Sequence, residues 1–423
     1  MAVEIGGLMA AAFTELLSAG GAVSGDYKLL KTTQISDDRR IDQYRRIKDL
    51  CGQRPEIIHL HNDGFIVRFK CENDFYLILK TEDLTETEIR KTSDYLATFG
   101  LSDHEMEECF FLYLRLHLNK LFKVKKIRRD VDRARDILEV SVEPGYAGHD
   151  IYDLITYHEN LNIYKIDQNS TFSTDEMWQI ASNIACNLSG YRSVLIEEST
   201  AQEMLSISDI APHLSENVYT ALTSIHWKYT FFELYKCLEA LFFLPWGMST
   251  KNAFQLKLTA LESHRAVMKI TSFREKEAES VVKLFEMLDD SIVANAKAGT
   301  IISFRSLALD GAEDKLTASK QSIGRRIYKI RNTLVHQEDY EDRDPLDLEN
   351  ENWSELIKFL CESIKYLYGN YRSDLDIRQT TTSTEVTGSS FTLALIPSTS
   401  EQTFTPISPD AFNDLPARVD VWD

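Results

Sequence analysis

The chain has 423 residues, too many for one ordinary hydrophobic core, so we expect two domains with connecting segments. With 43% hydrophobic and 27% charged residues, it has the composition of a globular protein that can bury substantial cores. The formal net charge of −19 argues against a protein that coats nucleic acid without specificity, because such binding depends on neutralising phosphates with Lys and Arg. A local basic patch on a short nucleic-acid segment is compatible with this charge.

The cysteines and the apolar runs indicate a soluble protein of a reducing compartment. The six cysteines are Cys51, Cys71, Cys109, Cys186, Cys237 and Cys361. No two have zinc-ligand or redox-motif spacing, so we expect free thiols, a cytoplasmic location, and neither metal nor cofactor. The first 20 residues include Glu4 and Glu15 and lack a basic start, which is not the pattern of a signal peptide. Residues 229–248, the most apolar later run, contain three charged residues, so we expect no membrane span.

Three short β-rich runs stand close together in the first half of the chain, at residues 56–61, 65–70 and 75–80. The segments between them are Asn62-Asp63-Gly64 and Glu72-Asn73-Asp74. Because Asn, Asp and Gly tolerate the positive φ angles of tight turns, the pattern predicts a three-stranded antiparallel meander.

The rest of the first half mixes helical and strand patterns. Ser102 and Glu105 have the spacing of a capping box, which predicts a helix over residues 106–121. Another helix is expected to begin near Ser173, because acidic residues follow it. Further strands are expected at residues 137–142, 162–166 and 193–197. Residues 1–205 are therefore predicted to form an α+β domain.

After residue 205 the pattern becomes helical, and residues 206–374 are predicted to form an all-α bundle. Apolar residues recur at helical spacing in four stretches, at residues 219–243, 276–296, 319–336 and 353–371. Pro245 and Gly247 are expected to end the first of these helices. Residues 375–423 are rich in Ser and Thr and predict a largely flexible tail with one short strand at 391–396.

The third helical stretch carries residues suited to chemistry on phosphate. Asn332 and His336 are four residues apart and share a face, whereas Arg331 lies about 140° around the helix from His336. Arginine offers a permanent, forked positive charge to phosphate oxygens, and histidine exchanges a proton near neutral pH. These groups suffice to cut RNA without a metal: the 2′-hydroxyl attacks the adjacent phosphate while His moves a proton and Arg stabilises charge.

The run Arg331-Asn332-Thr333-Leu334-Val335-His336 resembles the R-polar-xxx-H signature of the HEPN superfamily, with Asn in the polar position. The aromatic run at residues 231–243 is similar to the first helix of several such domains, and the resemblance covers residues 215–372. It implies a HEPN-like helical bundle that forms a homodimer, or a higher homo-oligomer, with one composite site. It also implies a metal-independent endoribonuclease of prokaryotic antiviral or toxin systems that attacks tRNA or other RNA. Arg331 and His336 would be catalytic, and Asn332 would orient them.

Basic residues in two places are candidates for RNA binding. They are Arg325, Arg326 and Lys329 on the motif helix, and Lys125, Lys126, Arg128 and Arg129 in the most basic stretch of the chain. That stretch also fits one solvated helix face. The acidic residues at 338–349 fit either a solvated loop or a latch that holds Arg325 and Arg326. His59 and His61 share one face of a predicted strand, but without a third ligand we interpret them as surface histidines.

Three hypotheses about function follow from these patterns. The leading one has residues 1–205 as a sensor or specificity domain for a viral or host trigger, and the bundle as an RNA-cutting effector. In the second, the bundle is a non-catalytic dimerisation module in which Arg331 and His336 stabilise an interface. In the third, the chain is a nucleic-acid-binding regulator that uses the basic stretch near Lys125.

Overall fold

The computed structural model describes residues 52–81, 85–118, 161–167, 172–271, 277–298, 316–335 and 353–375, together with residues 11, 14, 15, 42, 45–47, 50 and 155. Contacts divide the chain into two compact units, Met1–Thr380 and Thr381–Asp423, and all described residues belong to the first. The strands predicted at residues 137–142 and 391–396 lie outside the described residues, as does most of the predicted tail.

The first described part is an antiparallel sheet. Its strands are β1 (Glu56–His59), β2 (Phe65–Cys71), β3 (Asp74–Lys80), β4 (Leu101–His104) and β5 (Asn162–Ile166), in the order β1-β2-β3-β5-β4. The predicted meander is confirmed as β1, β2 and β3, and the strand predicted at residues 162–166 is confirmed as β5. Asn62 and Asp63, with φ of 55° and 57°, form the first turn, as their tolerance of left-handed backbone predicts.

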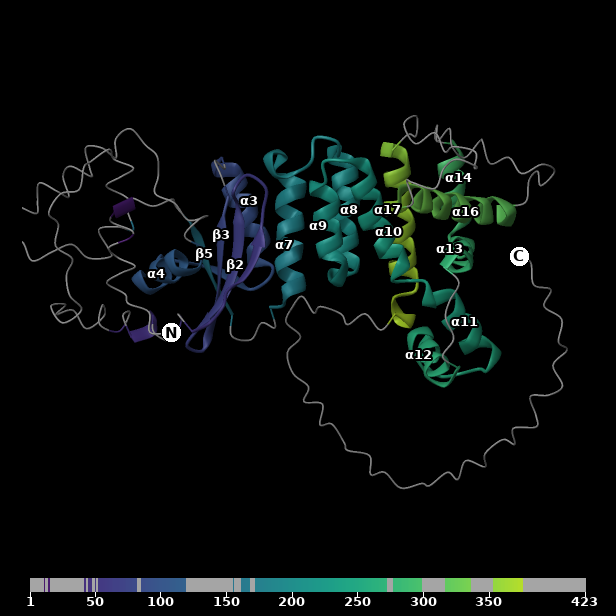
Figure 1. The fold of residues 1–423 in the computed structure, drawn as a ribbon, viewed down its shortest axis with the longest axis horizontal. Coiled ribbons are helices and arrows are strands. Elements are labelled where there is room, and N and C mark those ends of the chain that lie inside the picture. The colour runs from purple at the N-terminus through teal and green to yellow at the C-terminus, as the bar shows by residue number, and fades with distance from the viewer. Residues whose placement is uncertain are drawn as a thin grey trace, which may run out of the picture. The chain divides into compact units, whose positions relative to one another are not determined.

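Both faces of the sheet are buried, each by a different helix. Phe65, Val67 and Phe69 of β2 belong to a core cluster with aromatic residues of α4 (Glu108–His117). Ile66 points the opposite way and belongs to a second cluster that includes α7 (Thr174–Asn187). In Figure 1, α4 and α7 accordingly lie on opposite sides of the strands. Because both faces are covered, β2 and β3 are nearly continuous apolar runs.

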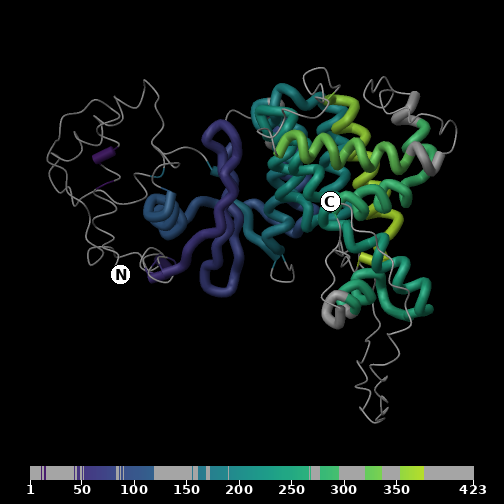
Figure 2. Tube along the Cα trace, turned by 45° about the vertical axis from the view of Figure 1, so that its right-hand side comes forward, coloured from purple at the N-terminus to yellow at the C-terminus, as the bar shows by residue number. Residues whose placement is uncertain are grey.

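The remaining described residues are mostly helical: α3 and α4 lie between strands of the sheet, and the described chain after β5 contains helices and no further strand. Further helices are α3 (Glu86–Ala97), α8 (Glu198–Ile210), α9 (Ser215–Thr223), α10 (Trp227–Glu239), α11 (Phe243–Ala253), α12 (Ala260–Thr271), α13 (Glu277–Glu286), α14 (Asp290–Ala298), α16 (Leu316–Val335) and α17 (Trp353–Asn370). Short 3-10 turns occur at Ser189–Tyr191, Pro212–Leu214 and Arg372–Asp374. Figure 2 follows the chain from the purple strands to the yellow-green α17. No helix among the described residues is long and apolar enough to cross a membrane.

One core cluster runs from a face of the sheet through α7 and α8 to α17. Helix α17 packs along α8 and α10, and α16 packs along α13. The boundary predicted after residue 205 falls within α8, whose buried Met204 and Ile207 belong to this cluster. In the described residues, the two predicted domains therefore share a continuous core.

Two local predictions in the first half are wrong. Ser102 does not cap a helix: it lies in β4, and α4 begins at Glu108 with no side-chain cap. Pairing between β4 and β5 satisfies this backbone instead. The strand predicted at residues 193–197 is a turn, in which the Ile196 N–H donates to the Ser193 carbonyl over 3.1 Å just before α8.

Two predicted helices in the second half are each divided. The stretch at 219–243 forms parts of α9 and α10, and α11 then begins at Phe243. Pro245 lies in the first turn of α11 and does not end a helix, because N–H groups of a first turn have no intrahelical acceptor to lose. The stretch at 276–296 is divided between α13 and α14, whereas the predictions at 319–336 and 353–371 are confirmed as α16 and α17.

The start of α7 yields a stability prediction. Ser173 accepts a hydrogen bond from the Glu176 backbone, and the Glu176 carboxylate accepts one from the Ser173 backbone, which makes a complete capping box. Ser173→Ala is expected to lower the free energy of unfolding by about 1 kcal/mol, measured by urea denaturation. Ser102→Ala, at the exposed strand position, is the control and should change it by less than about 0.5 kcal/mol. Equal losses in both variants would contradict the capping role.

Candidate functional site

Helix α16 has a buried face that anchors it and a polar face that carries the motif. Ile323, Ile327, Ile330 and Leu334 are buried, which confirms the stripe expected from their spacing. Gly324, on the same side, allows α13 to approach closely: a Cβ there would stand 2.8 Å from the Val282 Cα. This close packing against α13 fixes the position of α16. It thereby also fixes the side chains on the other faces of the helix.

The polar face of α16 presents a line of side chains that leads toward the end of the helix. Arg325 and Lys329 are exposed and Asn332 is partly exposed. Their separations of four and three residues place these three side chains on one face of the helix. His336 itself lies outside the described residues. Arg326, in contrast, is buried, with 9% of its surface exposed.

Arg331 lies beside this line and is surrounded by polar partners from three helices. Its Nη1 donates to the Asn332 Oδ1 over 3.0 Å. Its Nε stands 3.2 Å from the Glu277 Oε1, and its Nη2 stands 3.9 Å from the Glu239 Oε1. The guanidinium also lies over the Tyr235 ring, 6.0 Å from its centre. One arginine thus links α10, α13 and α16.

The partners of Arg331 are themselves held in place. Tyr235 and Glu239 are four residues apart on α10, so both face Arg331. The Tyr235 hydroxyl donates to the Glu277 Oε1 over 3.1 Å. Burial and the neighbouring charge of Glu277 raise the pKa of Tyr235, so the phenol keeps its proton. Burial, followed by repulsion from Glu277, also raises the pKa of Glu239, and the Arg331 charge opposes that rise.

The charge balance around Arg331 decides what the site can do as it stands. Two carboxylates face one guanidinium, so an incoming phosphate must displace at least one of them to gain the full fork of Arg331. The Arg331 side chain is 23% exposed, so solvent and a ligand have access to part of it. The arrangement is that of a partly exposed arginine whose guanidinium is occupied by two internal carboxylates.

The structure describes some of the residues predicted for the site and leaves others outside the described residues. The structure brings Arg331 and Asn332 into contact and places Arg325 and Lys329 along the same helix. Lys125, Lys126, Arg128 and Arg129 lie outside the described residues, as do the acidic residues at 338–349. Within the part of the chain that the structure describes, no group of three or more His, Cys, Asp or Glu side chains is arranged to hold a metal ion.

Sequence reasoning missed Tyr235, Glu239 and Glu277. Glu277 begins α13 and Glu239 ends α10, so both stand at helix ends that local pattern places only approximately. All three residues lie far from Arg331 in the sequence, so no helical spacing could predict that they contact it. Only the packing of α10, α13 and α16 brings them together.

The chain matches no protein-family model, no curated protein and no solved structure. Any assignment of function therefore depends on the residues of this chain and on their resemblance to the HEPN signature.

Proposed function

We propose that the chain is a metal-independent endoribonuclease of the HEPN type, with Arg331, Asn332 and His336 as its catalytic set. The observation that carries the proposal is the 3.0 Å hydrogen bond between Arg331 and Asn332 on the polar side of α16. The bond holds a forked cation beside Arg325, Lys329 and Asn332 on α16. His336 follows Asn332 by four residues in the sequence, as in the HEPN signature. An RNA backbone laid along this face meets the cations of α16, and in this proposal His336 supplies the proton transfer.

The proposed reaction needs only these side chains and the RNA. A histidine accepts the proton of a ribose 2′-hydroxyl as that oxygen bonds to the adjacent phosphorus. The bond from phosphorus to the 5′-oxygen breaks, and the leaving oxygen takes a proton. Arg331 stabilises the added negative charge on the phosphoryl oxygens. The products are one strand that ends in a 2′,3′-cyclic phosphate and one that begins with a 5′-hydroxyl.

In this proposal two copies of the chain form the working enzyme. The resemblance implies a homodimer, or a higher oligomer, in which two motif helices face each other. A second His336 then supplies the acid while the first acts as base. Such an enzyme would serve in the cytoplasm in antiviral defence or as a toxin, with residues 1–205 responding to a viral or host trigger.

The test of the proposal is cleavage of RNA without a divalent metal. Purified full-length protein, incubated with tRNA and with single-stranded RNA in the presence of chelator, is expected to release fragments with cyclic-phosphate ends. Because chelation removes metal-dependent nucleases, activity that survives it belongs to acid–base chemistry. Cleavage that disappears with chelator, or fragments with 5′-phosphate ends, would contradict the proposal.

The carboxylates on Arg331 yield a prediction about substrate affinity. In a His336→Ala background, the double variant Glu239→Gln with Glu277→Gln should bind RNA more tightly, because phosphate no longer competes with two negative charges. Each partly exposed pair contributes about 1 kcal/mol or less, so the expected gain is at most about fivefold per replaced carboxylate, measured by fluorescence anisotropy. Glu279→Gln is the control on the same helix, because that carboxylate pairs with Lys283 instead. An unchanged affinity in the double variant would contradict competition for Arg331.

One observation favours a second candidate, a non-catalytic helical interaction module. Arg331 ties α10, α13 and α16 together through its carboxylate partners, which is also what a structural arginine does. Under this alternative, Arg331→Ala lowers stability, by about 1 kcal/mol, and changes self-association while RNA stays intact. Measuring RNA cleavage and thermal unfolding on the same preparation distinguishes the two candidates.

A further inference from the structure

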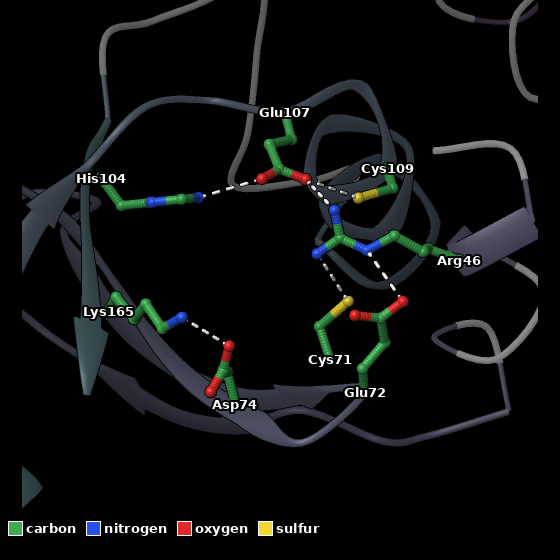
Figure 3. A network of polar contacts seen from close by, with 8 residues as sticks. All are labelled: Arg46, Cys71, Glu72, Asp74, His104, Glu107, Cys109 and Lys165. Carbon is green, nitrogen blue, oxygen red and sulfur yellow. Dashed lines mark hydrogen bonds and ion pairs between the residues drawn. The ribbon is translucent and has the colours of Figure 1, made fainter. Parts of the chain in front are cut away.

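A second polar cluster lies at one end of the sheet, independent of α16. Cys71 is the last residue of β2, and Cys109 lies in the first turn of α4. Figure 3 shows Arg46 reaching between them. The Arg46 Nη2 donates to the Cys71 sulfur over 3.3 Å, and in Figure 3 the sulfurs of Cys71 and Cys109 both point toward the guanidinium. Two cysteines that are far apart in sequence thus share one guanidinium.

The carboxylates of the cluster fix the arginine and distinguish the two sulfurs. Glu107 accepts a hydrogen bond from the Arg46 Nη1, and the same carboxylate oxygen lies 3.6 Å from the Cys109 sulfur. His104 contacts the other Glu107 oxygen over 3.0 Å, and Glu72 lies 3.6 Å from the Arg46 Nε. Arg46 acts on both sulfurs. A negative charge on Cys109 would be repelled by the half-buried Glu107, whereas one on Cys71 would be repelled by the exposed Glu72, which solvent screens.

The two thiols of this pair therefore differ in acidity. Hydrogen bonding from Cys109 lowers the pKa of Cys71, burial opposes this effect, and the Arg46 charge reinforces it. The same hydrogen bond, with burial, raises the pKa of Cys109. A thiol with a lowered pKa and a nearby thiol with a raised pKa supply one nucleophile and one partner for disulfide formation.

We propose that Cys71 and Cys109 form a peroxide-reactive thiol pair, in which Cys71 attacks the oxidant and Cys109 closes a disulfide between β2 and α4. The Cys71 thiolate attacks one oxygen of a hydroperoxide, an S–O bond forms, the O–O bond breaks, and the other oxygen leaves as water or alcohol after taking a proton. Cys109 then attacks the sulfenic sulfur and displaces water. Overall, two thiols lose two hydrogens and the peroxide is reduced.

Burial limits the oxidants that fit. Cys71 is 2% exposed and Cys109 is 1% exposed, so small hydroperoxides are favoured over bulky disulfides or alkylating reagents. Cys186, Cys237 and Cys361 are also buried, and burial is the largest cause of the raised pKa of each. They have the environment of inert core thiols and serve as internal standards.

The experiment uses the reduced full-length chain treated briefly with hydrogen peroxide. After removal of the peroxide, the protein is unfolded with an alkylating reagent, digested without reductant and analysed by mass spectrometry. A linked peptide pair containing Cys71 and Cys109, two hydrogens lighter than its thiol form, is expected, with Cys186, Cys237 and Cys361 alkylated. This measurement on the wild type needs no variant to fold.

Variants then assign the order of events. Cys109→Ser should leave one added oxygen on Cys71 that dimedone captures, whereas Cys71→Ser should leave Cys109 as a thiol. Arg46→Gln should slow disulfide formation several-fold. Absence of the linked pair in wild type at a peroxide dose that oxidises free cysteine would overturn the proposal. Oxygen found on Cys109 in Cys71→Ser, or equal oxidation of Cys186, would overturn it too.

Discussion

Replacement of His336 with alanine is expected to reduce RNA cleavage by about 10²- to 10⁴-fold, the usual contribution of a positioned acid or base. The imidazole is the only group of the proposed set that exchanges a proton near neutral pH. The measurement is the initial rate of fragment formation from tRNA in chelator, with wild type and variant at equal concentration. Binding of RNA should persist, because the cations of α16 remain.

Arg331→Ala should reduce RNA cleavage by a similar factor, for a different reason. It removes the guanidinium that stabilises the charge on the phosphoryl oxygens. Arg331→Lys keeps a positive charge but not the bidentate geometry, so it should restore only a small part of the rate. The ion pairs to Glu239 and Glu277 would also be lost in Arg331→Ala. Thermal unfolding must therefore be measured beside activity.

Matched controls separate these effects from general damage. His59 is exposed on β1, and Arg90 on α3 has a side chain that is 86% exposed. His59→Ala and Arg90→Ala should each retain wild-type cleavage. If His336→Ala cleaved RNA as fast as these controls, the catalytic proposal would fail and the interaction module would be favoured.

Gly324→Ala is expected to destabilise the protein even though alanine is the better helix former. The added Cβ would stand 2.8 Å from the Val282 Cα and 3.3 Å from the Val281 carbonyl oxygen, and backbone atoms cannot rotate away. Overpacking of this kind costs about 1–3 kcal/mol, more than the roughly 0.5–1 kcal/mol gained from helix propensity. A shift of α16 from α13 would also separate Arg331 from Glu277, so RNA cleavage should fall with stability.

Gly369→Ala is the matched control, because nothing lies within 4 Å of a Cβ at that position in α17. It should raise the free energy of unfolding by about 0.5–1 kcal/mol, measured by urea denaturation on the full chain. If both variants were stabilised equally, the close approach of α13 and α16 would be contradicted.

Elements with strong local periodicity could be predicted from sequence. Helices α16 and α17 were predicted within a few residues because their apolar positions recur at helical spacing over many turns. The β1–β3 meander was predicted because its turn residues tolerate left-handed backbone. In such segments, the local pattern of residues is enough to determine the secondary structure.

Features that depend on tertiary pairing could not be predicted. Ser102 has the chemistry of a helix cap, but β5 competes for the same backbone and pairs with it. The contacts of Arg331 with Glu239 and Glu277 join three helices, and Cys71 and Cys109 lie at the end of a strand and the start of a helix. The motif residues could be found in the sequence because they are close together in it. Their partners were missed because they lie far from the motif in the sequence.

The strand order of the sheet has a consequence for assembly. Its longest described strands, β2 and β3, are interior, while β1 and β4 at the two edges have four residues each and carry Glu56 and Asp103. Short, charged edge strands are poor templates for strand addition. The described strands therefore disfavour sheet-to-sheet growth into fibrils, and the proposed dimer would form through helix surfaces.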